Sequence, residues 1–216
     1  MSAQMLRLDH LVIVAPTLAE GEAHVQACLG LPMRAGGRHP QMGTHNLVLR
    51  LGDDLYLEVI ARDPEAPAPA GPRWFGLDDL DAVRAAWARG RRLRTLVART
   101  GAIAAVAAAH GALVGCPARI SRGERSWLFA LRPDGTLPED GAVPSVIDWE
   151  GLPGPAGAMP EAGARLVRLD LAHPEPDRIA ALHARLGLVD PPAFRAGPDF
   201  ALRALVRTPA GERVLT

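Results

Sequence analysis

The chain has 216 residues, and its 24 basic residues, all of them arginine, balance 24 acidic residues. This length suits one sizeable domain or two small ones, and the neutral charge gives no electrostatic case for binding nucleic acid or an anionic membrane. The longest apolar stretch, residues 102–109, is too short to cross a bilayer, and the N-terminus lacks the layout of a signal peptide. We therefore expect a cytoplasmic protein, and the arginine-only composition favours a GC-rich bacterial genome.

The first unit, residues 1–64, predicts the order β-α-β-β-β. Residues 6–16 predict a strand, and Thr17 with Glu20 has capping-box spacing at the start of a helix that ends at Gly30. The segment "RAGGRHPQMG" then predicts a loop, with a short strand at its start. Two further strands follow, "THNLVLRLG" and "LYLEVIA", separated by a Gly-Asp-Asp turn.

The second unit, residues 74–151, predicts the same order behind an additional helix at residues 77–91. The Pro- and Ala-rich residues 63–73 connect it to the first unit, and the Pro- and Gly-rich residues 151–164 form a second connector. Two similar units joined by such connectors indicate a repeated module.

The last part of the chain, residues 165–216, resembles the first unit again. A strand, a proline, a helix and a Leu-Gly-Leu turn recur at nearly the same spacing, with Arg168 where the first unit has His10. The sequence therefore predicts an α+β fold of repeated β-α-β-β-β modules, with a third partial repeat at the C-terminus, in one compact domain.

Two polar side chains interrupt apolar strand faces in the first unit. His10 shares a face with Val12 and Val14, and Glu58 lies in a strand whose two faces are both mostly apolar. An unpaired carboxylate is expensive to bury, so Glu58 has a partner or faces a cavity. Imidazole nitrogens and carboxylate oxygens are suitable ligands for a divalent metal. The alternative for His10 is a core histidine whose hydrogen bonds are satisfied.

This order of elements, with a histidine in "LDHLVI" and a glutamate in "LYLEVI", resembles the vicinal oxygen chelate superfamily, which includes glyoxalase I, extradiol dioxygenases and bleomycin-resistance proteins. More narrowly, "GGRHPQMGTHNLVLRLGDDLYLEVIARDP" and "PSVIDWEGLP" are similar to bacterial glyoxalase-like domain proteins. The resemblance covers nearly the whole chain. It implies paired modules whose sheets curl into a cupped half-barrel around a small cavity, with His10 and Glu58 side by side facing it.

The resemblance also implies a divalent metal ion, Zn, Ni, Mn or Fe(II), held by His10 and Glu58. Metal-dependent members take further ligands from the second module, where "VPSVIDWEG" offers Asp148 at the place equivalent to Glu58. The usual fourth ligand has no match, unless His45 or water supplies it. Members of the superfamily often form homodimers, and that assembly stays open for this chain.

Four further candidate residues each have two interpretations. His45 either points into the cavity as an acid or base, or only forms turn hydrogen bonds. Arg122 and Arg125 either form a solvated strand edge or bind an acidic group of the substrate. Trp149 either stacks on a ligand or packs in the core.

The predicted function is that of a metal-dependent glyoxalase-like enzyme, a lyase or isomerase that chelates vicinal oxygens of a small metabolite while Glu58 or His45 moves a proton. One alternative is a non-catalytic, drug-sequestering protein that binds small molecules in the same cavity. Another is an extradiol-type dioxygenase using Fe(II), which requires His10, His45 and Glu58 to converge.

Overall fold

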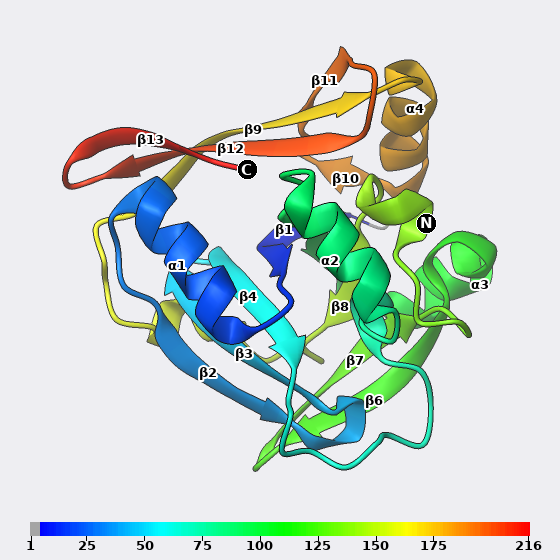
Figure 1. Ribbon diagram of the computed structural model, residues 1–216. Helices are drawn as coiled ribbons and strands as arrows, with labels where there is room; N and C mark the ends of the chain where they lie inside the picture. The colour runs from blue at the N-terminus through cyan, green and yellow to red at the C-terminus, as the bar shows by residue number, and fades with distance from the viewer. Residues whose placement is uncertain (1–4) are drawn as a thin grey trace.

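The computed structural model describes residues 5–216, which form two β-sheets with helices between and beside them (Figure 1). The first module supplies half of the larger sheet and has the predicted order of elements. Its elements are β1 (Leu6–Val14), α1 (Leu18–Leu29), β2 (Arg34–His39), the 3-10 turn η1 (Pro40–Met42), β3 (Thr44–Arg50) and β4 (Tyr56–Arg62).

The second module supplies the other half of the larger sheet. Its elements are η2 (Trp74–Gly76), α2 (Leu80–Ala88), β5 (Leu93–Arg99), α3 (Ile103–Val114), β6 (Cys116–Arg122), β7 (Arg125–Leu131), η3 (Pro138–Gly141) and β8 (Ser145–Asp148). The strands run in the order β2-β3-β4-β1-β5-β8-β7-β6, so the second module mirrors the first across the β1–β5 pair. This curled sheet confirms the predicted fold of paired β-α-β-β-β modules.

Local signals in the sequence form the helix of the first module as predicted. The Thr17 hydroxyl oxygen accepts a hydrogen bond from the Glu20 backbone N–H at 3.2 Å, which satisfies a free donor of the first helical turn. Gly30 ends α1 in the left-handed conformation at φ 70°, which glycine adopts without strain. These two residues fix where the chain turns between β1 and β2.

The segment "RAGGRHPQMG", expected to be a loop with a short strand at its start, instead forms the whole of β2 and η1. Its register against β3 shifts between Ala35 and Gly37, so Gly36 is an additional residue in a β-bulge. Glycine and charged residues are poor strand formers, but this strand lies at the edge of the sheet, where pairing with β3 decides the conformation.

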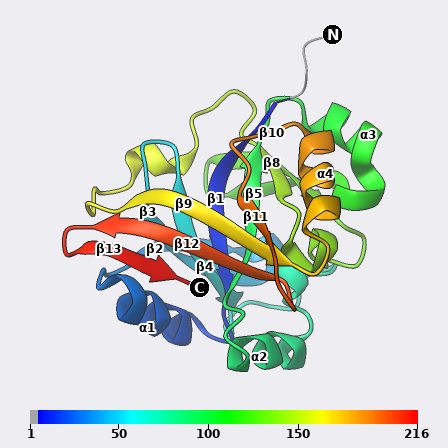
Figure 2. The same ribbon diagram turned by 90° about the horizontal axis from the view of Figure 1, so that it is seen from above.

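The C-terminal residues form a separate four-stranded sheet that packs on the helix side of the larger one (Figure 2). Its elements are β9 (Arg165–His173), α4 (Pro176–Leu186), β11 (Ala193–Ala196), β12 (Ala201–Thr208) and β13 (Gly211–Leu215), while β10 (Leu188–Val189) pairs with β1. The strand, helix and Leu-Gly-Leu turn of the repeat are present, but the order β11-β9-β12-β13 differs from that of the modules.

Two apolar clusters lie on the two faces of the larger sheet. Leu11 and Leu57 pack with α1 and the C-terminal sheet on one face, whereas Val12 and Ile60 pack with aromatic residues on the other. Alternation along each strand therefore separates a helix side from an inner side. The longest helices in the described chain have 12 residues, and none could cross a membrane.

Candidate active site

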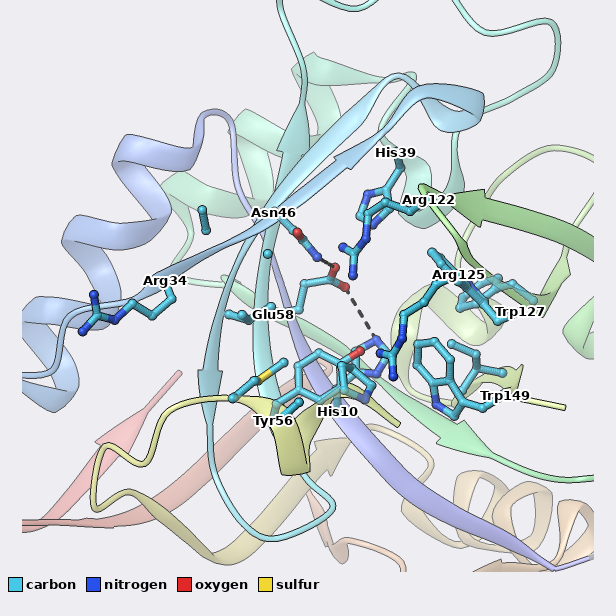
Figure 3. A pocket seen from close by; sticks show the side chains of 18 of the residues that line it. His10, Arg34, His39, Asn46, Tyr56, Glu58, Arg122, Arg125, Trp127 and Trp149 are labelled. Carbon is cyan, nitrogen blue, oxygen red and sulfur yellow. Dashed lines mark hydrogen bonds and ion pairs between the residues drawn. The ribbon is translucent and has the colours of Figure 1, made fainter. Parts of the chain in front are cut away.

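A cavity of about 270 Å³ lies on the inner face of the curled sheet, between the two modules (Figure 3). The first module contributes mainly polar side chains to it, and aromatic side chains line much of the opposite wall. The lining includes His10, His39, Asn46, Tyr56 and Glu58 on one side and Trp74, Phe75, Arg122, Arg125, Trp127, Phe129 and Trp149 on the other.

A β-bulge in β1 lies directly before His10 and changes which side chains of the strand face the cavity. Leu8 pairs with Ala98 of β5 and His10 pairs with Val97, so Asp9 is an additional residue between them. The bulge interrupts the alternation. Leu8 packs against the core on the helix side, although alternation from His10 would place it on the inner face.

His10 is buried and held from two directions. Its Nδ1 lies 2.7 Å from Asp9 Oδ1, and its Nε2 lies 3.6 Å from Glu58 Oε2. The ring stacks on Tyr56, its neighbour on β4, at a centroid distance of 4.5 Å. The short contact with Asp9 favours the tautomer with the proton on Nδ1, which leaves the lone pair of Nε2 facing the cavity.

Glu58 has protein partners, which explains how a buried strand accommodates its carboxylate. Asn46 Nδ2 donates a hydrogen bond to Glu58 Oε1 at 2.5 Å, from a position diagonal to Glu58 across the β3–β4 pair. Asn46 fits there because Gly36 has no side chain: a Cβ at Gly36 would lie 2.3 Å from Asn46 Oδ1. The glycine bulge in β2 thus makes room for the polar group that holds Glu58.

Asp9 is the most buried carboxylate of the site, with an exposed fraction of 1%. Besides His10, it accepts a hydrogen bond from the Trp149 indole N–H at 3.0 Å, and Arg99 Nη1 lies 3.8 Å from its second oxygen. Three groups therefore compensate its charge. The alternation pattern did not identify Asp9, because only the bulge brings its carboxylate to the same side as the neighbouring imidazole.

His39 is a second buried imidazole in the cavity wall. Its Nδ1 lies 3.2 Å from the Thr44 hydroxyl, and its ring meets Trp74 edge to face at 5.0 Å. Burial, with a smaller contribution from the positive charge of Arg122, lowers the pKa of His39 to about 3. This side chain is therefore neutral at physiological pH.

Arg122 and Arg125 both line the cavity, on the hairpin between β6 and β7. They are direct cross-strand partners, and Figure 3 shows both side chains extending toward Glu58 and His10. Within residues 5–216 neither guanidinium forms an ion pair or hydrogen bond, whereas Arg119 on the same strand pairs with Glu150 at 2.6 Å. Trp149 lies at the same wall, its ring 5.4 Å from Trp127.

Two predicted site residues, His45 and Asp148, lie outside the cavity. Neither belongs to its lining, and their neighbours Asn46 and Ile147 do. Successive side chains of a strand point to opposite faces, so an assignment wrong by one residue places a side chain on the helix side. Asp148 accepts hydrogen bonds from the backbone N–H groups of Ile103 and Glu150, and so caps the start of α3.

The expected metal site is therefore incomplete. His10 Nε2 and Glu58 Oε2 could serve as two ligands, but Asp148 does not join them, and residues 5–216 contain no group of three or more His, Cys, Asp or Glu side chains able to hold a metal. At the inner positions of β5 and β8 the second module has Val97 and Ile147, which offer no ligand atom. These residues do not fit a site with three protein ligands.

The connector at residues 151–164 closes one side of the cavity. It contributes Pro155, Ala158, Met159 and Pro160 to the lining, and Met159 packs against the cluster formed by Val48, Tyr56 and Ala156.

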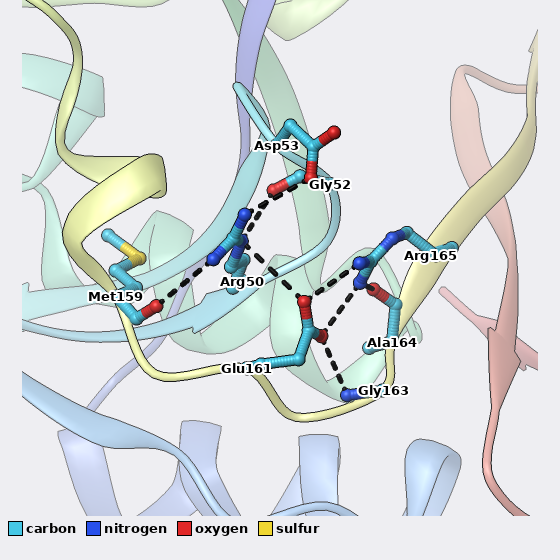
Figure 4. Close-up of polar contacts among 8 residues, drawn as sticks. All are labelled: Arg50, Gly52, Asp53, Met159, Glu161, Gly163, Ala164 and Arg165. Atoms are coloured by element: carbon cyan, nitrogen blue, oxygen red, sulfur yellow. Dashed lines mark hydrogen bonds and ion pairs between the residues drawn. The ribbon is translucent and has the colours of Figure 1, made fainter.

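A polar network fixes the far end of the connector (Figure 4). Arg50 donates to the backbone oxygens of Gly52 and Met159, and Glu161 forms two hydrogen bonds of 2.7 Å with Arg165. The segment is therefore a wall of the site rather than a free linker.

Comparisons with known proteins agree with this architecture. The glyoxalase-like domain family matches residues 8–187. A hypothetical protein from Staphylococcus aureus is 12% identical, with 91% of this chain and 88% of that chain covered and a TM-score of 0.61. At this identity the likeness shows the fold alone.

Methylmalonyl-CoA epimerases are more distant structural matches. The enzyme from Streptomyces coelicolor, in complex with 2-nitronate-propionyl-CoA, is 16% identical over 71% of this chain and 100% of its own, with a TM-score of 0.42. The enzyme from Mycobacterium tuberculosis is 15% identical over 68% and 91%, with a TM-score of 0.41. Likeness at this level carries no argument about the reaction, and no curated protein matches the chain.

The family match over most of the chain, together with the paired modules, shows that the protein belongs to the glyoxalase-like domain family of the vicinal oxygen chelate superfamily.

Proposed function

We propose that the protein is a glyoxalase-like enzyme that moves a proton on a small, acidic, oxygenated metabolite. The observation that carries this proposal is the His10–Glu58 pair, whose Nε2 and Oε2 atoms lie 3.6 Å apart at the floor of the cavity. A carboxylate and an imidazole that flank the same space are suited to general acid–base chemistry.

The pair would act on a carbon–hydrogen bond next to a carbonyl group. Glu58 Oε2 or His10 Nε2 would accept the proton as the C–H bond breaks, and would return it to a different atom or face of the substrate. Asp9 would act as a positioning residue, since its bond to Nδ1 fixes the imidazole and stabilises the positive charge formed on protonation. Asn46 would hold the Glu58 carboxylate in place through Nδ2.

Negative charge that develops on the substrate requires a partner. Arg122 and Arg125 line the cavity and form no ion pair or hydrogen bond within residues 5–216, so they would hold an acidic group of the substrate. Because only two protein ligands converge, we assign no step to a metal ion. Elemental analysis of the purified protein and of His10→Ala and Glu58→Ala variants tests the metal-dependent form of this proposal directly.

A second candidate function is non-catalytic binding of a small molecule. The aromatic wall favours it, because Trp74, Phe75, Trp127 and Phe129 give the cavity the apolar lining of a ligand pocket. The Fe(II) dioxygenase has no such support, because His45 does not converge with His10 and Glu58.

Hydrogen exchange separates the enzyme from the binding protein. A panel of 2-oxo and 2-hydroxy acids is incubated with the protein in D₂O, and NMR follows loss of the signal from the C–H next to the carbonyl or hydroxyl. For at least one acid we expect the C–H to exchange faster with the protein than without it. The His10→Gln and Glu58→Gln variants should both lose this acceleration. Saturable binding of the same acids without exchange would support the binding protein instead.

A further inference from the structure

The two guanidinium groups on the β6–β7 hairpin are arranged in a way that the fold itself does not require. Arg122 and Arg125 are directly opposite each other on either side of the Gly123–Glu124 turn. Like charges at opposite positions destabilise a strand pair. Both side chains nevertheless line the cavity, and no carboxylate among the described residues pairs with either of them. An anion bound between them would remove this repulsion.

The position of Arg122 limits the shape of such an anion. Its guanidinium lies over the Trp127 ring at 5.9 Å, and the Cδ and Nη1 atoms pack against Gly37, where a Cβ would approach within 3.0 Å and 3.2 Å. The side chain is thus held between a strand and an indole ring. A guanidinium in a fixed orientation favours a planar, bidentate acceptor such as a carboxylate.

The wall beside the guanidinium groups is aromatic. Trp127 and Trp149 lie with ring centroids 5.4 Å apart, and Phe129 and Trp74 continue the surface at 5.2 Å from each other. The ring planes are inclined by 47° within the first pair and by 63° within the second, so a planar ligand can lie against the face of one ring and meet the edge of its neighbour. The cavity of about 270 Å³ is near the lower end of the range of ~300–1,000 Å³ for ligand pockets, which suits a small ligand of one ring and a short acid chain.

The charges around the cavity also favour a single negative charge on the ligand. His39 is neutral at physiological pH, so the positive charge on this wall comes from the arginines. The Glu58 carboxylate, held by Asn46, would repel a second negative group placed near it. The acidic group of the ligand therefore belongs with the guanidinium groups of the hairpin.

We propose that the ligand of this cavity is a small monocarboxylate with a planar, unsaturated body. Its carboxylate binds between Arg122 and Arg125, its planar part packs against the indole rings of Trp127 and Trp149, and the remaining end faces His10 and Glu58. This inference rests on the proposed function for the identity of the reacting end, but the binding selectivity is independent of any reaction.

Three unreactive probes separate the contributions to binding. Isothermal titration calorimetry with the wild-type protein compares 3-phenylpropanoate, the neutral 3-phenylpropan-1-ol and the ring-free propanoate. We expect the aromatic acid to bind at least ~10-fold more tightly than either of the other two, because only it satisfies both the guanidinium groups and the aromatic wall. Equal affinity for the acid and the alcohol would overturn the proposal. Phenyl phosphate is tested in the same way, and tighter binding of it than of 3-phenylpropanoate would also overturn the proposal.

Variants of the hairpin provide the second arm of the test. In Arg122→Gln and Arg125→Gln the preference for the acid over the alcohol should fall ~10-fold or more, while binding of the alcohol stays unchanged. Arg119→Gln is the matched control, because Arg119 lies on β6 with Arg122 but pairs with Glu150 outside the cavity. An unchanged preference in both cavity variants would contradict the proposal. Thermal melting of each variant verifies that it is folded.

The two proposals fail in different ways. If the aromatic acid binds selectively but no acid undergoes hydrogen exchange, the ligand class stands and the enzymatic function fails. If exchange occurs with acids that have no ring, at rates equal to those of aromatic ones, the enzymatic function stands and the ligand class is wrong.

Discussion

The two modules share one fold but contribute different chemistry to the same cavity. On the first module, β1, β3 and β4 present His10, Asn46 and Glu58; at inner positions of β5 and β8 the second module presents Val97 and Ile147. The difference shows that a repeated backbone provides equivalent positions without requiring equivalent side chains. One module can carry polar groups that are costly to bury, while the other supplies the apolar wall that excludes water.

The largest expected effect comes from removing the polar groups of the first module. His10→Gln and Glu58→Gln should each slow the exchange of the substrate C–H with D₂O by a factor of ~10² to 10⁴, which is the range of general acid–base catalysis. The control is His45→Gln, because His45 lies next to this set in sequence but outside the cavity. An equal loss in the control would contradict the division of β3 into an inner and an outer face.

A smaller effect should follow from Asp9→Asn, which keeps the size of the side chain. An amide can donate a hydrogen bond to Nδ1, so the imidazole would adopt the other tautomer and lose the lone pair on Nε2. We expect ~10- to 100-fold slower exchange, with binding of 3-phenylpropanoate changed less than 3-fold. A change in binding alone would show that Asp9 shapes the wall through Trp149 instead.

The glycine bulge of β2 provides a backbone test of the same module. In Gly36→Ala the new methyl group would displace Asn46 and release Glu58, so we expect ~10-fold slower exchange and a loss of about 1–3 kcal/mol in the free energy of unfolding. Gly71→Ala is the matched control, because a Cβ at Gly71 meets no atom within 4 Å. Equal stability of the two variants in urea would refute the packing argument.

The pH dependence of stability tests the buried imidazole beside the aromatic wall. The folded state lowers the pKa of His39 from 6.5 to about 3, so the unfolded chain binds a proton more readily between these values. Stability contributed by neutral His39 is therefore complete above about pH 6.5 and is lost as the pH falls toward 3. In His39→Phe, the loss of unfolding free energy between pH 7 and pH 5 should be smaller than in the wild type. An identical loss in both proteins would exclude His39 as its source.

The smallest effect should come from Asp148→Asn in the second module. Asp148 accepts one hydrogen bond from the Ile103 N–H at the start of α3 and one from the Glu150 N–H, so the variant should lose about 1 kcal/mol of stability and leave exchange of the substrate C–H unchanged. If this variant lost a bound metal ion, or no longer exchanged the substrate C–H, the predicted role of Asp148 as a metal ligand would be restored.

The sequence by itself determined the paired modules and the position of His10 and Glu58. Strand periodicity, the Thr17 cap and the repeated Leu-Gly-Leu turn act over a few residues, so they are visible without tertiary contacts. The pairing of β1 with β4, which the superfamily resemblance implied, then places the two side chains together.

Tertiary structure decided the remaining features of the site. The bulges at Asp9 and Gly36 depend on register against a neighbouring strand, and one residue of shift reverses which side chains face the cavity. The sequence favoured His45 and Asp148, whereas in the folded strands their neighbours Asn46 and Ile147 face the cavity. The aromatic wall combines residues 74 and 75 with residues 127, 129 and 149, which are distant in sequence and meet only when the second module folds.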